Sequence, residues 1–406
     1  MQQFVLYCHK RGIALIPLCL IILACGLWTE MEILVPSLPD MKHFFGLSDA
    51  QIQQLLTANF LGFFLGVLVS GPLCDSIGRK PMVVWGGALY LLSCGVCALA
   101  GDFSVLLAAR FVQGIAMTGP SLAGGVLLFE HTSGERQIFW MALANSMVTC
   151  AMAASPIVGS WINGTWGFHG NLWCILLVGA LGIIPAVLWV PETLGEENRK
   201  SLQLAELASG YWSLSTDRRY MLMTLPICAL AASYYIYVGI SSLYMVEHLG
   251  IEPSLFARYQ GPIVGCFSLV SLGASRLLKS FGLVRSLVLS FVVMMLGCLP
   301  LLALSVLGEE SALATTLCMM LIVGGMAPIC ALLYPYALNH LDQDLQGKAQ
   351  ALLQAFRLLL ASCGTVLLGL VYTGPFLPVA ILLLFSILFS CACIWRGRSL
   401  VAKAGV

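Results

Sequence analysis

The chain has 406 residues, of which 59% are hydrophobic and only 10% are charged, and its formal net charge is +1. A soluble domain of this length carries far more charge on its surface, so the composition excludes an ordinary soluble globule. The net charge gives no indication of a nucleic acid partner, because the lysines and arginines lie mainly in short polar segments. The sequence therefore predicts an all-α polytopic membrane protein.

Twelve apolar runs follow one another along the chain, each long enough to cross a bilayer as a helix. Their approximate ranges are 12–36, 50–72, 81–100, 103–129, 137–162, 169–190, 220–246, 254–278, 283–307, 311–338, 346–372 and 375–395. Several breaks between runs contain proline, glycine or asparagine, which favour turns. The pattern predicts twelve transmembrane helices.

Basic residues are distributed unevenly around these predicted helices. With the N-terminus in the cytoplasm, 16 of the 20 lysines and arginines fall in inside segments. Lys42 alone falls in an outside loop, and the remaining three, Arg110, Arg258 and Arg357, lie within predicted spans. Because inside loops are enriched in basic residues, we expect a multi-pass protein of the inner (cytoplasmic) membrane with both termini in the cytoplasm.

The longest polar stretch, residues 191–219, divides the chain. We interpret it as a cytoplasmic linker between an N-terminal six-helix bundle over 1–190 and a C-terminal six-helix bundle over 220–406, which ends in a short cytoplasmic tail. Residues 273–282 stand in the second half where residues 71–81 stand in the first. This correspondence indicates a weak internal repeat of two parallel halves.

Residues 71–81 form a charged segment between two long apolar runs, which we expect to be a compact turn. Its glycines would let two helix ends approach closely, and its charged residues can form ion pairs. The spacing G-x-x-x-D-x-x-G-R-K resembles the cytoplasmic loop signature of the major facilitator superfamily of transporters, with Ser76 where that family usually has arginine. The resemblance implies an inner gate formed by Gly71, Asp75, Gly78, Arg79, Lys80 and Glu130.

Two glutamates lie in the outer half of the first run, just before Pro36. An ionisable residue in hydrocarbon needs a cavity or a partner, unless it reaches the headgroups, which is the alternative for both Glu30 and Glu32. The segment 32–39 resembles the first helix of the bicyclomycin-resistance-like (Bcr/CflA) drug:proton antiporters, in which an acidic residue precedes a proline-rich helix end by four. The resemblance implies that Glu32 is the principal proton carrier and that its protonation releases Arg110, with the roles of the two glutamates exchanged as the alternative.

Two further motifs support this family. Arg110-x-x-Gln113-Gly114 reads as a second superfamily signature, and it places Arg110 at about the depth of the two glutamates. Its alternative role is structural, as a donor to helix carbonyls. Pro156-x-x-Gly159 resembles the core of the antiporter motif, although close helix packing alone also explains such small residues.

Candidate substrate-binding residues are polar, aromatic or sulfur-containing side chains within predicted spans. They are Asn59, Gln113, Met117, Asn145, Tyr234, Tyr237, Tyr334, Gln354 and Arg357. Apart from Glu247, the spans of the second half contain no acidic residue, so ion coupling is expected mainly in the first half. We therefore expect Arg357 to pair with a glutamate distant in the sequence or to bind an anionic substrate.

These observations predict a secondary transporter working by alternating access, which exports drugs or other small amphipathic molecules in exchange for protons. The alternative substrate is an organic anion, such as a siderophore or carboxylate, moved in either direction; a non-transporting receptor on the same fold is disfavoured. No phosphate-binding loop is present and the 16 cysteines are scattered singly, so we expect no ATP-driven pump, enzyme, metal site or cofactor beyond the proton gradient. The expected partners are a small-molecule substrate, protons and the lipid bilayer, and the expected state is a monomer.

Overall fold

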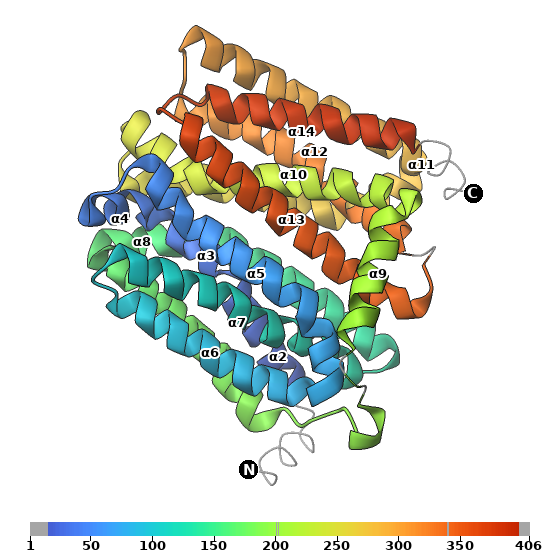
Figure 1. Cartoon of the computed structure of the whole chain (residues 1–406). Helices are drawn as coiled ribbons and strands as arrows, with labels where there is room; N and C mark the ends of the chain where they lie inside the picture. Colours follow the sequence, from blue (N-terminus) through green and yellow to red (C-terminus); the bar gives the residue numbers. More distant parts are fainter. Residues whose placement is uncertain (1–14, 200, 202, 339–340, 398–406) are drawn as a thin grey trace. The chain divides into compact units, whose positions relative to one another are not determined.

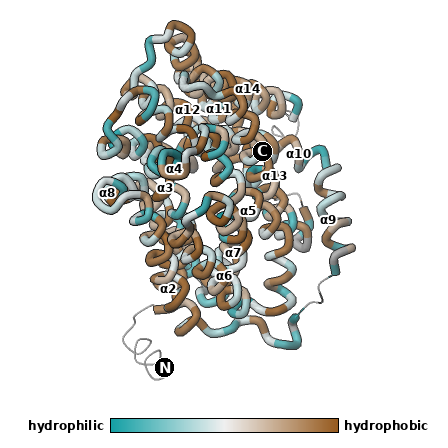
Figure 2. The backbone as a smooth tube through the Cα atoms, turned by 60° about the vertical axis from the view of Figure 1, so that its left-hand side comes forward, coloured by the Kyte–Doolittle hydropathy of each residue, from teal (hydrophilic) through white to brown (hydrophobic). Residues whose placement is uncertain are grey.

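The structure, a computed structural model, describes residues 15–199, 201, 203–338 and 341–397, and these contain helices and no strand (Figure 1). The α-helices are α2 (Leu15–Trp28), α3 (Glu30–Leu34), α4 (Leu38–Phe45), α5 (Asp49–Ile77), α6 (Arg79–Leu99), α7 (Phe103–Glu130), α8 (Gly134–Trp189), α9 (Leu204–Thr216), α10 (Arg218–Ser242), α11 (Phe256–Leu307), α12 (Ala312–Leu338), α13 (Gln343–Val371) and α14 (Leu377–Arg396). Hydrophobic residues dominate most of them, whereas hydrophilic residues gather at helix ends and in connecting segments (Figure 2).

Among the described residues, nine helices are long and apolar enough to cross a membrane, and a bent pair formed by α2 and Glu30–Phe45 makes a tenth. Two of the nine belong to unusually long helices: α8 has 56 residues and α11 has 52. Each is broken by one glycine with a positive φ, Gly167 (67°) in α8 and Gly282 (73°) in α11. The breaks fall where the sequence predicts one span to end and the next to begin. The all-α polytopic architecture is confirmed, and each long helix accounts for two of the twelve predicted spans.

The described helices form two compact units. The first comprises the chain up to Leu34 together with Ala58–Gln203, and the second comprises Val35–Thr57 together with the chain from Leu204 onward. Helix α5 therefore begins in the second unit and ends in the first. The sequence predicts bundles over 1–190 and 220–406, whereas Val35–Thr57 belongs to the second unit. The predicted linker, residues 191–219, contains helix α9.

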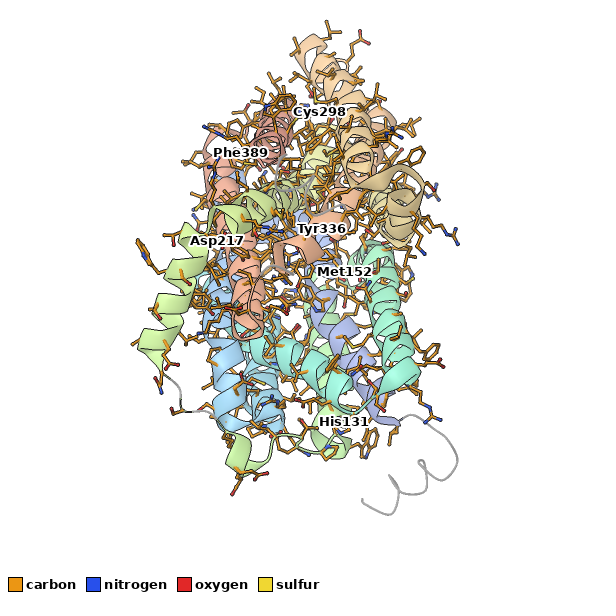
Figure 3. All side chains as sticks on the ribbon, turned by 90° about the vertical axis from the view of Figure 1, so that its right-hand side faces the viewer. His131, Met152, Asp217, Cys298, Tyr336 and Phe389 are labelled. Atoms are coloured by element: carbon orange, nitrogen blue, oxygen red, sulfur yellow. The ribbon has the colours of Figure 1, made fainter. Side chains whose placement is uncertain are left out.

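Polar contacts fix Val35–Thr57 within the second unit. Gln53 Nε2 donates to the Gly239 carbonyl oxygen (2.9 Å), and Thr57 Oγ1 donates to Thr365 Oγ1 (3.2 Å). Lys42 Nζ forms an ion pair with Glu247 Oε2 (2.5 Å). Helix α10 in this unit is capped by Asp217 (Figure 3), because its Oδ1 accepts from the Tyr220 N–H (2.9 Å), one of the helix-end donors that lack an intrahelical partner.

The signature segment 71–81 is helical except at Gly78, so the prediction of a compact turn over the whole segment is wrong. Helix α5 continues to Ile77 with Pro72 inside it, and α6 begins at Arg79, so Gly78 alone separates them. Gly78 has a φ of 108°, and a Cβ atom there would lie 2.3 Å from Glu192 Oε2. A Cβ atom at Gly71 would meet nothing within 4 Å, so Gly71 makes no close approach, and the space at Gly78 accommodates the Glu192 carboxylate rather than a second helix end.

Candidate functional site

The first span bends by 43° between α2 and Glu30–Phe45, and this bend precedes both glutamates. Thr29 lies at the break, where its hydroxyl donates to the Cys25 carbonyl oxygen (2.9 Å), a contact that commonly bends helices. The chain then continues past Pro36 through a 3-10 turn into α4, whereas the sequence predicted an end at Pro36. Glu30 and Glu32 are 1% and 2% exposed, so neither reaches the headgroup region as the alternative required.

Glu30 is held by three polar partners. Its Oε1 accepts from Asn59 Nδ2 (3.0 Å) and lies 3.7 Å from Arg110 Nη1, and its Oε2 accepts from the Tyr90 hydroxyl (2.7 Å). Arg110 is itself only 1% exposed. A buried charge pair is tolerated only when further hydrogen bonds satisfy both partners, which Asn59 and Tyr90 provide for the carboxylate.

Arg110 is satisfied less completely than its carboxylate partner. Its Nη1 donates to Gln113 Oε1 (2.6 Å) and its Nη2 lies 3.7 Å from the sulfur of Met31, but its buried Nε has no hydrogen-bond partner. Gln113 Nε2 in turn donates to Cys94 Sγ (3.0 Å). The two polar residues of the R-x-x-Q signature thus contact each other directly, because they lie one helical turn apart.

Two glycines bring Asn59 and Arg110 together. A Cβ atom at Gly114 would lie 2.1 Å from the Asn59 carbonyl oxygen, and one at Gly62 would lie 2.1 Å from that of Phe111. Helices α5 and α7 therefore touch backbone to backbone, which only glycine permits. The close contact lets Asn59 reach both the Glu30 carboxylate and the Arg110 carbonyl oxygen (3.4 Å).

Glu32 lies in the same short helix but has a different environment. Its Oε2 is buried and has no hydrogen-bond partner, and the ion pair of Arg110 goes to Glu30 instead. Residues two apart in a helix point about 200° apart, so the two glutamates face different neighbours. The expectation that Arg110 pairs with Glu32 is wrong in this structure.

The predicted antiporter motif packs against the same short helix. A Cβ atom at Gly159 would lie 2.4 Å from the Ile33 carbonyl oxygen, so α8 touches the backbone of α3 at the residue that follows Glu32. Asn171 Nδ2 donates to the Gly159 carbonyl oxygen (3.0 Å), and Pro156 is buried one turn earlier. The motif thus has a packing role at the helix that carries the carboxylates.

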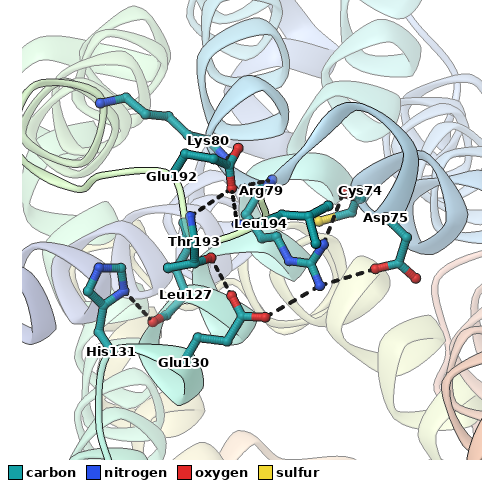
Figure 4. Close-up of polar contacts among 10 residues, drawn as sticks. All are labelled: Cys74, Asp75, Arg79, Lys80, Leu127, Glu130, His131, Glu192, Thr193 and Leu194. Atoms are coloured by element: carbon teal, nitrogen blue, oxygen red, sulfur yellow. Dashed lines mark hydrogen bonds and ion pairs between the residues drawn. The ribbon is translucent and has the colours of Figure 1, made fainter. Parts of the chain in front are cut away.

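The signature residues meet around the Arg79 guanidinium (Figure 4). Its Nη2 lies 3.3 Å from Asp75 Oδ1 and 3.3 Å from Glu130 Oε1, so one arginine joins the end of α5 to the end of α7. Glu130 also accepts a hydrogen bond from the Thr193 hydroxyl. The structure therefore brings Asp75, Arg79 and Glu130 together, while the Lys80 side chain extends away from them.

Glu192 binds the beginning of α6. Its carboxylate oxygens accept from the Arg79 and Lys80 N–H groups, each at 3.1 Å, and from the N–H groups of Thr193 (2.8 Å) and Leu194 (2.9 Å). Burial opposes ionisation of this carboxyl, but the four backbone donors outweigh burial and lower the pKa of Glu192. An anion at a helix N-terminus also interacts favourably with the helix dipole.

The remaining candidates of the first unit do not join these clusters. Met117 is buried, whereas Asn145 is exposed on α8 and accepts from Thr149 Oγ1 through its carbonyl oxygen (2.7 Å).

The aromatic candidates lie in the second unit. The buried Tyr237 hydroxyl donates to Gln260 Oε1 (3.1 Å), and the Tyr234 ring lies 6.3 Å from the Tyr237 ring. Tyr334 packs at the edge of the core. Tyr237 is thus a packed and hydrogen-bonded core residue.

Arg357 has a different environment from Arg110. Its guanidinium carbon lies 5.4 Å from the centre of the Tyr235 ring, and no carboxylate of the described residues forms an ion pair with it. Its buried Nε has no hydrogen-bond partner, and neither has Oε1 of Gln354, one turn earlier on α13. These two side chains leave polar atoms unsatisfied next to each other along one helix face.

Three residues that hold these clusters were not among the predicted site residues: Tyr90, Cys94 and Glu192. For Tyr90 and Cys94 no signal was available, because such residues in apolar runs are more often packing residues. For Glu192 a signal existed, since an acidic residue directly after the sixth run can accept from the free N–H groups of a neighbouring helix start.

Comparison with known proteins identifies the family. The model described as Major Facilitator Superfamily matches residues 20–365. The chain is also similar in fold to a D-xylose-proton symporter, with a TM-score of 0.73 at 14% identity over 93% of this chain and 96% of that one.

Curated relatives are distant. The chain is 24% identical to the uncharacterized MFS-type transporter YdgK of Bacillus subtilis, over 89% of this chain and 90% of that protein. It is 31% identical to the bicyclomycin resistance protein homolog of Haemophilus influenzae, over 45% and 46%, and 24% identical to the multidrug resistance protein MdtM of Salmonella typhimurium, over 69% and 68%. Because the family model covers most of the chain, this multi-pass membrane protein belongs to the Major Facilitator Superfamily of transporters and is not an enzyme.

Proposed function

We propose that this transporter exports drugs or other small amphipathic molecules in exchange for protons. The observation that carries the proposal is the pair of buried carboxyls on one five-residue helix, of which Glu30 is fully partnered and Glu32 is not. Relatives whose names record bicyclomycin and multidrug resistance support the substrate class.

In this proposal Glu32 carries the proton. An unpaired buried charge is strongly unfavourable, so Glu32 must hold a proton or receive a cationic partner at each stage of the cycle. Arg110 is the candidate partner, since it is ion-paired with Glu30, two residues before Glu32 in the sequence, and retains an unsatisfied Nε. Exchange of Arg110 between the two carboxyls would couple protonation to a rearrangement at the bend of the first span.

The inner cluster supplies the gate in this proposal. Asp75, Arg79 and Glu130 hold the ends of three helices, and their separation would accompany opening toward the cytoplasm. We place the protein in the inner membrane with both termini in the cytoplasm, on the distribution of basic residues.

The test uses purified protein in proteoliposomes with cationic, neutral and anionic compounds, with and without an imposed pH gradient. Cationic and neutral amphiphiles should be driven by the gradient. Glu32→Gln should abolish gradient-driven transport and preserve gradient-independent exchange, because substrate binding does not need the proton. If gradient-driven transport survives in Glu32→Gln but is lost in Glu30→Gln, Glu30 carries the proton instead of Glu32. If transport by the wild type does not depend on the pH gradient, the proposal is overturned.

A second candidate function rests on Arg357. Its guanidinium has no carboxylate partner among the described residues, and Gln354 presents an unsatisfied oxygen beside it. An organic anion would satisfy the arginine. This alternative predicts that carboxylates, rather than cations, are transported.

A further inference from the structure

An open cleft of about 340 Å³ lies at the beginning of α6. It is lined by Lys80, Pro81, Val84, Trp85, Glu192 and Arg199. All six belong to the first unit. None of Glu30, Glu32 and Arg110 lines it, so it is distinct from the proposed proton site.

The charges of the cleft favour an anion. Lys80 and Arg199 contribute two positive charges and Glu192 one negative charge. The Glu192 carboxylate is already bound by four backbone N–H groups, whereas the Lys80 side chain extends away from the Arg79 cluster (Figure 4). A phosphate group complements the two basic side chains, which are the usual protein donors to it.

The apolar wall of the cleft continues into a lipid-facing stripe. The exposed apolar residues of α6 recur every three or four positions, which places them on one helix face. They are Trp85 (72% exposed), Leu89 (41%), Leu92 (68%), Val96 (46%) and Leu99 (75%). In a membrane protein such a face contacts acyl chains, and Trp85 at its end is a typical residue of the headgroup level. The cleft therefore combines basic groups with the end of an acyl-chain surface.

We propose that this cleft binds an anionic phospholipid. Lys80 and Arg199 bind the phosphate, Trp85 and Val84 contact the glycerol and the first acyl carbons, and the acyl chain follows the exposed face of α6. One of the lipid-binding residues, Lys80, directly follows Arg79 and donates its N–H to Glu192, so the lipid would lie next to both. The proposal needs only membrane insertion and is independent of which substrate is transported.

The experiment measures lipid binding to the purified full chain by native mass spectrometry and by thermal stability in detergent. Phosphatidylglycerol should bind and stabilise, phosphatidylcholine should do so weakly, and inorganic phosphate should have no effect because it lacks the acyl chains. Equal effects of phosphatidylcholine would overturn the role of charge, and equal stabilisation by inorganic phosphate would overturn the lipid as occupant.

Variants locate the site. Each basic side chain near an anionic lipid contributes about fivefold in affinity, so Lys80→Gln/Arg199→Gln should weaken phosphatidylglycerol binding by about thirtyfold. Arg285→Gln, which removes an exposed basic residue of α11, is the matched control and should bind like the wild type. Arg199 lies outside the helices, so Arg199→Gln alone should fold even if the double variant does not. It should lose about fivefold in affinity for phosphatidylglycerol. Unchanged binding in the variants would refute the site.

Discussion

Arg110 and Arg357 are both arginines within predicted spans, but their environments differ. Arg110 lies in the first unit, 1% exposed, with the Glu30 carboxylate 3.7 Å away and Gln113 as a hydrogen-bond partner. Arg357 lies in the second unit over the Tyr235 ring, without a carboxylate among the described residues. The first charge is internally compensated, so its removal should damage the fold. The second is not, so its removal should mainly affect what binds there.

The largest expected effect is that of Arg110→Ala. It leaves Glu30 buried without its cation, and breaking a buried ion pair in this way destabilises a protein by about 3–5 kcal/mol. Thermal unfolding in detergent measures it, with Arg258→Ala, an exposed arginine of α11, as the control. Adding Glu30→Gln should recover part of the loss. If Arg110→Ala unfolds like the wild type, the pair does not stabilise the first unit and the contrast with Arg357 fails.

Arg357→Gln separates the two transport hypotheses. For a cationic or neutral substrate, binding should change little, which is the result we expect. For an anion, losing a charge-assisted hydrogen bond should remove about 1.5–3 kcal/mol, or roughly ten- to a hundredfold in affinity, and Arg357→Lys should restore only part. Equilibrium binding of the compound panel measures this change. A large loss of affinity confined to anions would show that the protein transports anions rather than exporting drugs.

Arg79 extends the comparison to a less buried arginine that, like Arg110, has acidic partners. Asp75→Asn removes one of its two ion pairs and should shift the protein toward states open to the cytoplasm, with a coupling on the order of 1–3 kcal/mol. Modification of introduced cysteines from the cytoplasmic side should increase. Unchanged labelling together with unchanged turnover would show that the segment is only a connector.

The smallest expected change in stability concerns Glu192, an anion stabilised by backbone donors instead of an arginine. Its pKa is lowered in the folded state, so its contribution to stability is present above its unfolded-state pKa and is lost as the pH falls through the folded-state pKa. Glu192→Gln should therefore destabilise by about 0.3–1 kcal/mol at neutral pH and by less in acid. Unfolding midpoints across pH test this. An equal effect at all pH values would mean that its charge is irrelevant.

The sequence alone determined the helical membrane architecture and the location of the charged motifs. Apolar runs of sufficient length must become helices in a bilayer, because every backbone polar group there needs an internal partner. Arg110-x-x-Gln113 became a contact because residues three apart share a helix face. Local spacing is sufficient for such features.

Tertiary structure decided the partners. Arg110 binds Glu30 rather than Glu32 because helix rotation separates the glutamates and because the glycines of α5 and α7 bring Asn59 to the same carboxylate. The contact of Glu192 with the start of α6 likewise joins residues more than a hundred positions apart. The sequence could not show these contacts, since they depend on how closely helices approach and which way each one is turned.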